Sequence, residues 1–201
     1  VGSLVKLSVF RADERSPLQI ARQHAQAERA LEQSGLAYTI LRPVFFMQNL
    51  IGMLRDDAFY TGAGDGRVAM IDARDIAAVA VAALTHPGQR GRTYTLTGPE
   101  TLRFDDVASI LARYTGRPIR HVRVPPEAVS AGLRQRGMQA WFADDMAQLH
   151  GMLADGYEDV VTDQVRAVTH RPPGSFARFT RDSVGAFGRS QQAGERNGEL
   201  H

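Results

Sequence analysis

HAQAERALEQSGLAYTILRP, residues 24–43, decides the fold, because it joins a helix to a short buried strand through a tight turn. Apolar residues in its first half recur at helical spacing, and Gly35 is the residue type that commonly ends a helix. Pro43 stops the apolar run that follows, since proline restricts the residue before it and cannot donate to a ladder. We therefore predict a helix up to Ser34 and a strand over residues 36–43.

The residues before this unit predict another strand and the start of the helix. LVKLSVF, residues 4–10, has the β-branched and aromatic content of a buried strand. Ser16 followed by Pro17 is typical of a helix start, with serine as the N-cap and proline at the first helical position. The chain begins with Val1, close to this strand, so we expect that an upstream segment has been removed by processing or by choice of boundary.

Downstream of the opening unit, helical and strand patterns alternate. Helices are predicted over residues 45–57, 72–86 and 103–116, and strands over residues 67–71, 92–97 and 118–124. Such alternation is typical of a mostly parallel sheet covered by helices, which is the α/β class.

From Pro126 onward the pattern becomes mainly helical. Two helices are predicted before residue 156, then a polar crossing, then a last helix after Pro172–Pro173. The final residues show no periodicity and are predicted to be disordered. The expected organisation is an α/β part over residues 1–125, a helical segment over residues 126–187 and a tail over residues 188–201.

The composition excludes several classes of function. The 201 residues include no cysteine, which excludes disulfides, thiolate zinc sites and cysteine nucleophiles, and Lys6 is the single lysine. No apolar run approaches the roughly 20 residues of a membrane-spanning helix. The arginines are scattered among acids, without the basic stripe of a nucleic-acid-binding protein. We expect a small-molecule partner, no nucleic acid, no membrane and a cytoplasmic location; the oligomeric state is left open.

The one glycine-rich loop, TGAGDG at residues 61–66, does not match a dinucleotide fingerprint. That fingerprint requires a strand, then G-x-G-x-x-G, then a helix whose N-terminus faces the pyrophosphate. Here the loop follows a predicted helix and enters a predicted strand, so we predict a turn. The chain also has no G-x-x-x-x-G-K-[ST] loop and no G-x-S-x-G elbow, so no Ser/His/Asp triad is proposed.

His24 and Glu28 form the candidate catalytic pair. Their spacing of four residues puts them on one helix face, with Ile20, Ala27 and Leu31 on or beside it. An imidazole and a carboxylate could exchange a proton there, the carboxylate raising the pKa of the histidine. A metal site would need a third ligand that the sequence does not offer. The structural alternative is a hydrogen-bonded pair that fastens the helix to the sheet.

Ligands of open α/β sheets bind beyond the carboxyl ends of the strands. Ser8 lies near the end of the first predicted strand, and Arg42–Pro43 end the next one. Residues 45–47 could form the wall of an apolar pocket, with Asn49 as a polar contact, or could simply be core. The other histidines are isolated and predicted to be surface or capping residues: His86, His121, His150, His170 and His201.

Four segments in one order resemble the NmrA-like atypical short-chain dehydrogenase/reductases. They are LVKLSVF, H-A-x-A-E-x-x-L-x-x-S-G-L-x-Y-T-I-L-R-P-x-F-F-M-Q-N, RVAMIDARDIAAVAVAAL and YTLTGPETLRFDDVASIL. VTDQVRAVTHRPPGSFARF, residues 161–179, resembles the C-terminal ending of the same family. The resemblance implies an incomplete Rossmann-type parallel sheet with helices on both faces, a small C-terminal substrate lobe, and binding of NADP(H) or NAD(H).

The chain departs from the family pattern in two ways. Family members begin with a strand and a G-x-x-G-x-x-G turn ahead of the strand that matches residues 4–10, and neither is present. We therefore expect a fragment that lacks the main cofactor-binding loop. Typical short-chain dehydrogenases also use a Tyr-x-x-x-Lys pair, and His24 and Glu28 stand in its place.

The resemblance implies an NAD(P)H-dependent oxidoreductase acting on a quinone-like or carbonyl acceptor, with His24 and Glu28 as catalytic groups. The alternatives are a dinucleotide-sensing regulatory protein without catalysis and an inactive truncated chain. No metal or flavin is implied. The residues expected at the nicotinamide end are Ser8, Phe10, Pro43, Val44 and Phe45, and those expected to contact the acceptor are Phe46 and Asn49.

Overall fold

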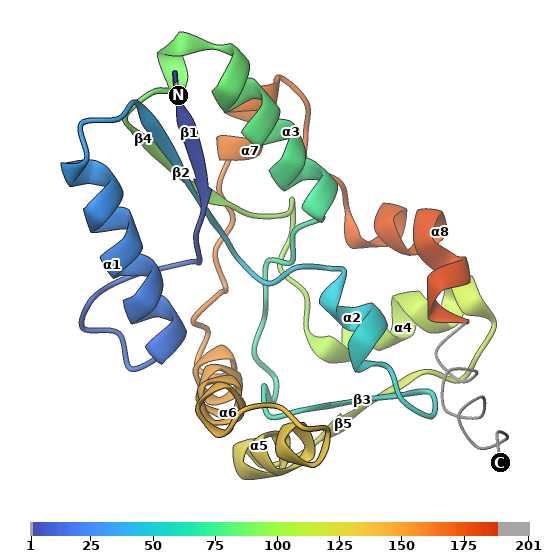
Figure 1. The fold of residues 1–201 in the computed structure, drawn as a ribbon. Coiled ribbons are helices and arrows are strands. Elements are labelled where there is room, and N and C mark those ends of the chain that lie inside the picture. Colours follow the sequence, from blue (N-terminus) through green and yellow to red (C-terminus); the bar gives the residue numbers. More distant parts are fainter. Residues whose placement is uncertain (1, 189–201) are drawn as a thin grey trace, which may run out of the picture.

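Three parallel strands form the main sheet of the structure, a computed structural model that describes residues 2–188 (Figure 1). They are β1 (Leu4–Leu7), β2 (Tyr38–Pro43) and β4 (Arg92–Leu96), in the order β1-β2-β4. The register pairs Leu4 with Tyr38 and Thr39 with Arg92. Parallel strands joined through helices confirm the predicted α/β class.

Helices cover both faces of this sheet, because successive residues of a strand point to opposite sides. Leu41 of β2 belongs to a buried apolar cluster with Ile76 of α3 (Ala73–Thr85), whereas Arg42 reaches Glu28 of α1 (Gln19–Gln33). α1 and α3 therefore lie on opposite faces (Figure 1). α7 (Gln164–Thr169) packs beside α3 and against β4.

A second sheet consists of β3 (Ala58–Thr61) and β5 (Arg120–Arg123), which are parallel. α4 (Phe104–Thr115) packs on it, and α8 (Phe176–Phe187) packs on α4. The strands are parallel, as the sequence pattern predicts, but the described strands are divided between two sheets and do not form a single one. Strand periodicity shows which side chains share a face, but the choice of neighbouring strand depends on tertiary contacts.

Two further helices, α5 (Pro126–Gln135) and α6 (Ala140–Ala154), pack against each other below the main sheet in Figure 1. α6 also contacts α1, and α5 contacts β3. The remaining described elements are short: α2 (Asn49–Met53) and the 3₁₀ helix η1 (Pro87–Gln89). The α5–α6 pair thus faces the carboxyl ends of β1 and β2.

The start of α1 differs from the prediction. The helix begins at Gln19 rather than Pro17, because Ser16 accepts the Leu18 N–H (3.2 Å) in a turn that precedes the helix. The N–H groups of Gln19 and Ile20 donate instead to the carboxylate of Asp145 on α6, at 2.9 and 2.7 Å. A side chain far along the chain therefore caps this helix.

The predicted helix over residues 45–57 is also shorter than expected. Phe46 forms a parallel bridge with Ile71, and the Ile71 N–H donates to the Phe45 carbonyl (2.9 Å), so these residues are extended and only α2 is helical. α7 occupies part of the stretch predicted as a polar crossing. Residues 189–201 of the predicted tail lie outside the described residues.

The glycine-rich loop is a turn, as predicted, and its glycines have a packing role. The Gly66 N–H donates to the Ala63 carbonyl (2.9 Å). A Cβ atom on Gly66 would lie 2.0 Å from the Leu153 carbonyl oxygen of α6, so no side chain fits. The loop is glycine-rich because its backbone presses against a helix.

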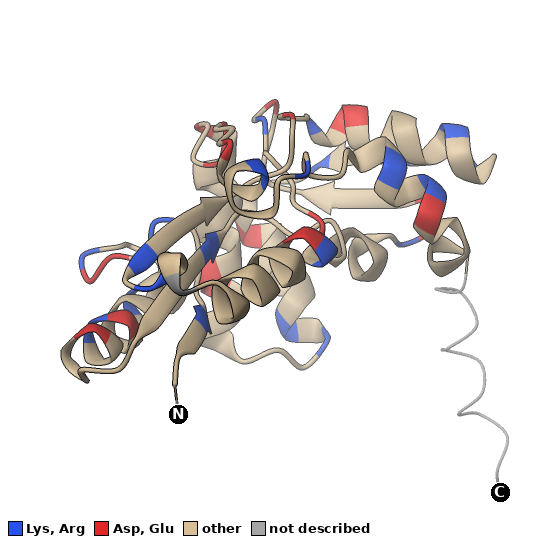
Figure 2. Ribbon diagram, turned by 90° about the horizontal axis from the view of Figure 1, so that it is seen from above, with Lys and Arg blue, Asp and Glu red and all other residues tan. Residues whose placement is uncertain are grey.

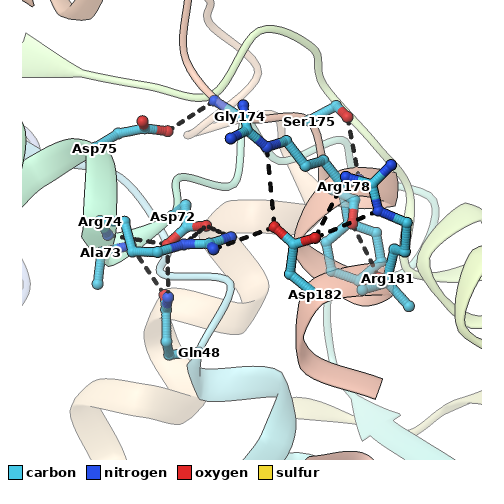
Figure 3. Close-up of polar contacts among 12 residues, drawn as sticks. Gln48, Asp72, Ala73, Arg74, Asp75, Gly174, Ser175, Arg178, Arg181 and Asp182 are labelled. Carbon is cyan, nitrogen blue, oxygen red and sulfur yellow. Dashed lines mark hydrogen bonds and ion pairs between the residues drawn. The ribbon is translucent and has the colours of Figure 1, made fainter. Parts of the chain in front are cut away.

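A polar cluster around the buried carboxylate of Asp72, the Asp72 cluster, ties α2, α3 and α8 together (Figure 3). It comprises Gln48, Asp72, Arg74 and Asp182. Asp72 caps α3 by accepting the Arg74 N–H (2.9 Å), and it also accepts from Arg74 Nε (2.8 Å) and Gln48 Nε2 (2.8 Å). Arg74 continues to Asp182 of α8 at 3.2 Å. The bonds of this cluster either cap α3 or link α3 to the start of α2 and to α8.

Basic and acidic residues are interspersed along the ribbon, including on α1 (Figure 2). Several form exposed ion pairs, such as Arg29 with Glu14 at 3.1 Å and Arg134 with Asp144 at 2.6 Å. Among residues 2–188 there is no helix that combines the length and the apolar character needed to cross a membrane.

Candidate functional site

A cavity of about 880 Å³ lies between the carboxyl ends of β1 and β2 and the α5–α6 pair. Its walls are mainly apolar: α6 contributes Phe142, Met146 and Leu149, and α5 contributes Val129 and Leu133. The size is within the range of about 300–1,000 Å³ that small-molecule sites have. Its place is also the one where open α/β sheets bind their ligands.

Seven residues predicted from the sequence as cofactor or acceptor contacts line this cavity. They are Ser8, Phe10, Pro43, Val44, Phe45, Phe46 and Asn49. The chain leaves the sheet here along two paths held together by backbone bonds: the Ser8 N–H donates to Leu41 (2.7 Å) and the Phe10 N–H to Pro43 (2.9 Å). These bonds prolong the β1–β2 ladder beyond Leu7 and bring the two strand ends side by side.

His24 and Glu28 do not line the cavity, although Ile20 and Ala21, one turn earlier on α1, do. No hydrogen bond joins His24 to Glu28 in the described part of the chain. Each contacts the sheet separately. The structure therefore does not bring the predicted catalytic pair together with the predicted cofactor residues, and its catalytic role stays a prediction.

Glu28 fastens α1 to the sheet. Its side chain is buried and accepts from Arg42 Nε at 3.1 and 3.2 Å, from a second Arg42 nitrogen, and from the Ser8 hydroxyl. The hydrogen bond with Glu28 raises the pKa of Arg42. Because Ser8 also lines the cavity, this ion pair holds one edge of the cavity in place.

His24 lies beside the single lysine. Its Nδ1 is 3.1 Å from Nζ of Lys6 on β1. Burial lowers the pKa of His24, and the charge of Lys6 lowers it further, while Glu28 acts in the opposite direction. The carboxylate of Glu28 does act to raise the pKa of this histidine, as predicted, but desolvation and the neighbouring cation outweigh it, so the net shift is downward.

Tyr157 and Glu158 also belong to the cavity wall and were not predicted as site residues from the sequence. The Tyr157 ring stacks edge-on against Phe10, with centroids 5.4 Å apart, and the Arg11 guanidinium lies 5.0 Å from its centre. Glu158 is 5% exposed and accepts the Phe45 N–H (2.9 Å). Both lie in the stretch between α6 and α7, where no periodic pattern drew attention to them.

Two histidines predicted to be at the surface are buried. His150 of α6 accepts the Gly62 N–H at 3.0 Å, and burial lowers its pKa to about 4, with His121 adding to the effect. The side chain of His121 on β5 lies 2.8 Å from Thr61 and 3.1 Å from Asp105. Tertiary packing encloses both in a way that isolated positions in a sequence do not reveal.

The other histidine predictions have different outcomes. His86 and His170 are exposed and stand at the C-caps of α3 and α7, as predicted. His201 lies outside the described residues. Over residues 2–188, no group of three His, Asp or Glu side chains could hold a metal ion.

Comparisons with known proteins agree with this architecture. The model of the NmrA-like family matches residues 10–168. An NAD(P)H azoreductase from Xenophilus azovorans is 40% identical over 177 residues, which cover 86% of this chain and 62% of that protein. An agroclavine dehydrogenase from Claviceps fusiformis is 38% identical over 157 residues, covering 74% of this chain and 54% of that protein. The chain thus spans less than two thirds of the length of these relatives.

A solved structure with the same fold is the NADPH-dependent quinone oxidoreductase from Escherichia coli complexed with NADPH. Its TM-score is 0.80 at 24% identity, and the match covers 92% of this chain and 66% of that chain. The two sheets, the flanking helices and the α5–α6 pair therefore belong to a known Rossmann-like arrangement.

Proposed function

The chain belongs to the NmrA-like family, and from this premise we propose that it forms the acceptor-binding part of an NAD(P)H-dependent oxidoreductase. The observation that carries the proposal is the 880 Å³ apolar cavity at the carboxyl ends of β1 and β2. The proposed substrate is a small quinone-like or carbonyl molecule, reduced in the cytoplasm. The names of the azoreductase and dehydrogenase relatives support a redox activity dependent on a nicotinamide.

The chemistry of the cavity wall fits the nicotinamide end of such a cofactor. Phe10, Pro43, Val44 and Phe45 present apolar surface where two parallel strands end, and a flat ring can lie on it without leaving polar groups unpaired. Ser8 stands at the edge of this surface. When bound, the reduced nicotinamide supplies a hydride.

The acceptor would occupy the part of the cavity between this surface and the α5–α6 pair. Phe46 and Asn49 border that part, with Met146 and Leu149 of α6 among the apolar groups around it. A planar aromatic acceptor buries apolar area against such walls, and Asn49 can hydrogen-bond to a carbonyl oxygen. Exclusion of water by these side chains would protect the hydride from loss to solvent.

His24 and Glu28 enter the proposal as positioning residues. Glu28 holds Arg42 and the Ser8 hydroxyl, so it would keep the β1 end of the cavity rigid without touching the acceptor. His24, beside Lys6, lies one turn of α1 away from the residues that line the cavity. Their kinetic effect should therefore be smaller than that of a cavity residue.

Titration of the 201-residue chain with reduced nicotinamide mononucleotide tests the cofactor assignment, because that ligand lacks the adenosine half. We expect binding that Phe45→Ala weakens at least about tenfold, as the loss of a buried aromatic contact predicts. Asp159→Asn, an exposed neighbour of the cavity residues Tyr157 and Glu158, should leave binding unchanged. Equal binding to all three proteins would refute the assignment.

Oxidation of NADPH and NADH with 1,4-naphthoquinone tests the activity, both with this chain and with the longest natural reading frame that contains it. Turnover that depends on the quinone supports an oxidoreductase. Cofactor binding without turnover across quinones, azo compounds and carbonyls would refute it. That result would favour the dinucleotide-sensing regulator, which the absence of a Tyr-x-x-x-Lys pair also favours.

A further inference from the structure

Glu158 is an ionisable group held firmly in the wall of the cavity. Its side chain is 5% exposed, and its Oε2 accepts the Phe45 N–H at 2.9 Å. Its backbone carbonyl accepts the Ala69 N–H at 3.0 Å. The residue is thus fixed at both ends, by the segment that leaves β2 and by the segment that leads into α3.

The second carboxyl oxygen of Glu158 is free to act. Oε1 has no hydrogen-bond partner among residues 2–188, and it is not sealed away from solvent. Glu158 is also one of the residues that line the cavity, so a molecule bound there lies beside this residue. Phe45 lines the same cavity, and its N–H orients the carboxyl group of Glu158.

The surroundings of Glu158 keep a proton on it. Burial raises the pKa of Glu158 to about 7, while the Phe45 N–H and the charge of Arg11 act in the opposite direction. Arg11 is 4.9 Å from the Phe10 ring and 5.0 Å from the Tyr157 ring, and no ion pair joins it to Glu158. An acid with a pKa near the working pH is suited to general acid catalysis.

The other titratable groups around the cavity are less suited to this task. They are Arg55, Asp56, Tyr60, Arg136, His150 and Tyr157, of which Arg55, Asp56, Tyr60 and Arg136 are exposed. His150, with a pKa of about 4, is unprotonated near neutral pH, and its Nδ1 already accepts from Gly62. Burial raises the pKa of Tyr157, which makes it a weaker acid. The arginines do not release protons.

We propose that Glu158 is the general acid of this site and donates its proton to the acceptor as the acceptor is reduced. The inference rests on the proposed oxidoreductase function. A neutral quinone, carbonyl or azo acceptor takes a hydride, with its electron pair, from a reduced nicotinamide dinucleotide and becomes an anion. The O–H bond of Glu158 breaks as an O–H or N–H bond forms on that acceptor. Water then returns a proton to the carboxylate.

The choice of acceptor tests this role. A neutral quinone needs both a hydride and a proton, whereas a cationic triphenylmethane dye such as crystal violet becomes neutral by taking a hydride alone. Glu158→Gln can still accept the Phe45 N–H but has no acidic proton. We expect Glu158→Gln to lower kcat for 1,4-naphthoquinone by about 100-fold or more, the usual contribution of a general acid. Its kcat for crystal violet should change less than about threefold.

The design separates failure of the role from failure of the function. If the unaltered protein reduces neither acceptor, the oxidoreductase proposal fails and this role fails with it. If it reduces both and Glu158→Gln lowers the two rates equally or not at all, only the role of Glu158 is refuted. Retained dye reduction also demonstrates that the variant is folded. Asp159→Asn, the exposed carboxylate next in the chain, should match the unaltered protein with both acceptors.

A second readout needs no turnover. In the 201-residue chain labelled with ¹³C at glutamate carboxyl groups, we expect one resonance to titrate with a midpoint of about 7. This resonance should be absent from Glu158→Gln. A Glu158 resonance that titrates at the ordinary value for glutamate would overturn the proposal, since the residue would then carry no proton at neutral pH.

Discussion

Asp72 and Glu158 are both almost fully buried, at 2% and 5% exposure, yet their pKa values shift in opposite directions. Burial alone would raise the pKa of Asp72, but hydrogen bonds from Arg74 and Gln48 and the charge of Arg74 outweigh it and lower the value (Figure 3). Glu158 accepts one backbone N–H, which does not offset burial.

This difference separates a carboxylate that stabilises the fold from a carboxyl group that can donate a proton. A buried charge persists where partners satisfy it and is neutralised by a proton where they do not. The charge of Asp72 is balanced by hydrogen bonds and an ion pair that join three helices. Glu158 keeps a proton that a bound molecule can take.

Asp72→Ala should cause the largest loss of stability. It removes the cap of α3 and leaves Arg74 and Gln48 without their shared acceptor. We expect the free energy of unfolding to fall by about 2–3 kcal/mol, the combined cost of a lost helix cap and of a lost hydrogen bond to a buried charged group. Urea denaturation measures it, with Asp182→Asn as a control expected to lose less. A loss below about 1 kcal/mol would place the cluster with surface ion pairs and remove the contrast with Glu158.

Glu158→Gln should reveal the opposite behaviour through pH. Between its ordinary pKa and the raised folded value of about 7, Glu158 is protonated in the folded chain and ionised in the unfolded chain. Its contribution to stability is therefore complete below the ordinary value and is lost as the pH rises through about 7. The variant has no such group. Its stability relative to the unaltered chain should rise by about 3 kcal/mol across this range.

Urea denaturation of both proteins at several pH values measures this difference. Subtracting one from the other removes the contribution of His150, whose pKa of about 4 acts over an overlapping range. A pH-independent difference would mean that Glu158 is ionised in the folded chain. Glu158 would then be a buried charged carboxylate like Asp72, and the contrast between the two residues would be refuted.

The sequence predicted those parts of the molecule that depend on local chemistry. Asp72 is the N-cap of α3 and Gly116 is the C-cap of α4, as their residue types indicate. α8 begins after the proline pair. The cavity residues at the ends of β1 and β2 also follow from a local rule, because ligands of α/β sheets bind where strands end.

What the sequence could not predict depends on residues far apart in the chain. The pairing of β3 with β5 joins segments that are separated in the chain by α3, β4 and α4. Glu158 lies in a stretch without periodicity, and its burial arises only when the segment packs under Phe45. His24 and Glu28 were correctly predicted to lie on one helix, but their partners on the strands, Lys6 and Arg42, were not predicted.

Asp145→Ala should have an intermediate effect, because this carboxylate has two backbone partners. It caps α1 from α6 by accepting the Gln19 and Ile20 N–H groups. We expect a loss of about 1–2 kcal/mol, the range measured for helix caps. Hydrogen exchange at those two amides should become faster, whereas Asp144→Asn on the same helix should leave it unchanged. Unchanged exchange in Asp145→Ala would show that α1 does not depend on this contact.

His24→Ala should have the smallest effect. It tests whether a residue on the helix that borders the cavity affects activity without contacting the cavity. His24 shares α1 with two cavity residues, but its imidazole contacts Lys6 and not the cavity. We expect kcat for a quinone and the affinity for NADPH each to change less than about threefold. The pKa of Lys6 should stay lowered in this variant, because burial, the main cause of the shift, remains.

A fall in kcat of tenfold or more for His24→Ala would contradict this expectation. It would restore His24 to the catalytic role that its place in the Tyr-x-x-x-Lys pattern implies. The comparison with Glu158→Gln then decides between the two groups. If His24→Ala impairs quinone reduction and spares the cationic dye, the proton comes through His24. If only Glu158→Gln gives that pattern, the general acid is Glu158, in the segment after α6, and not a residue of α1.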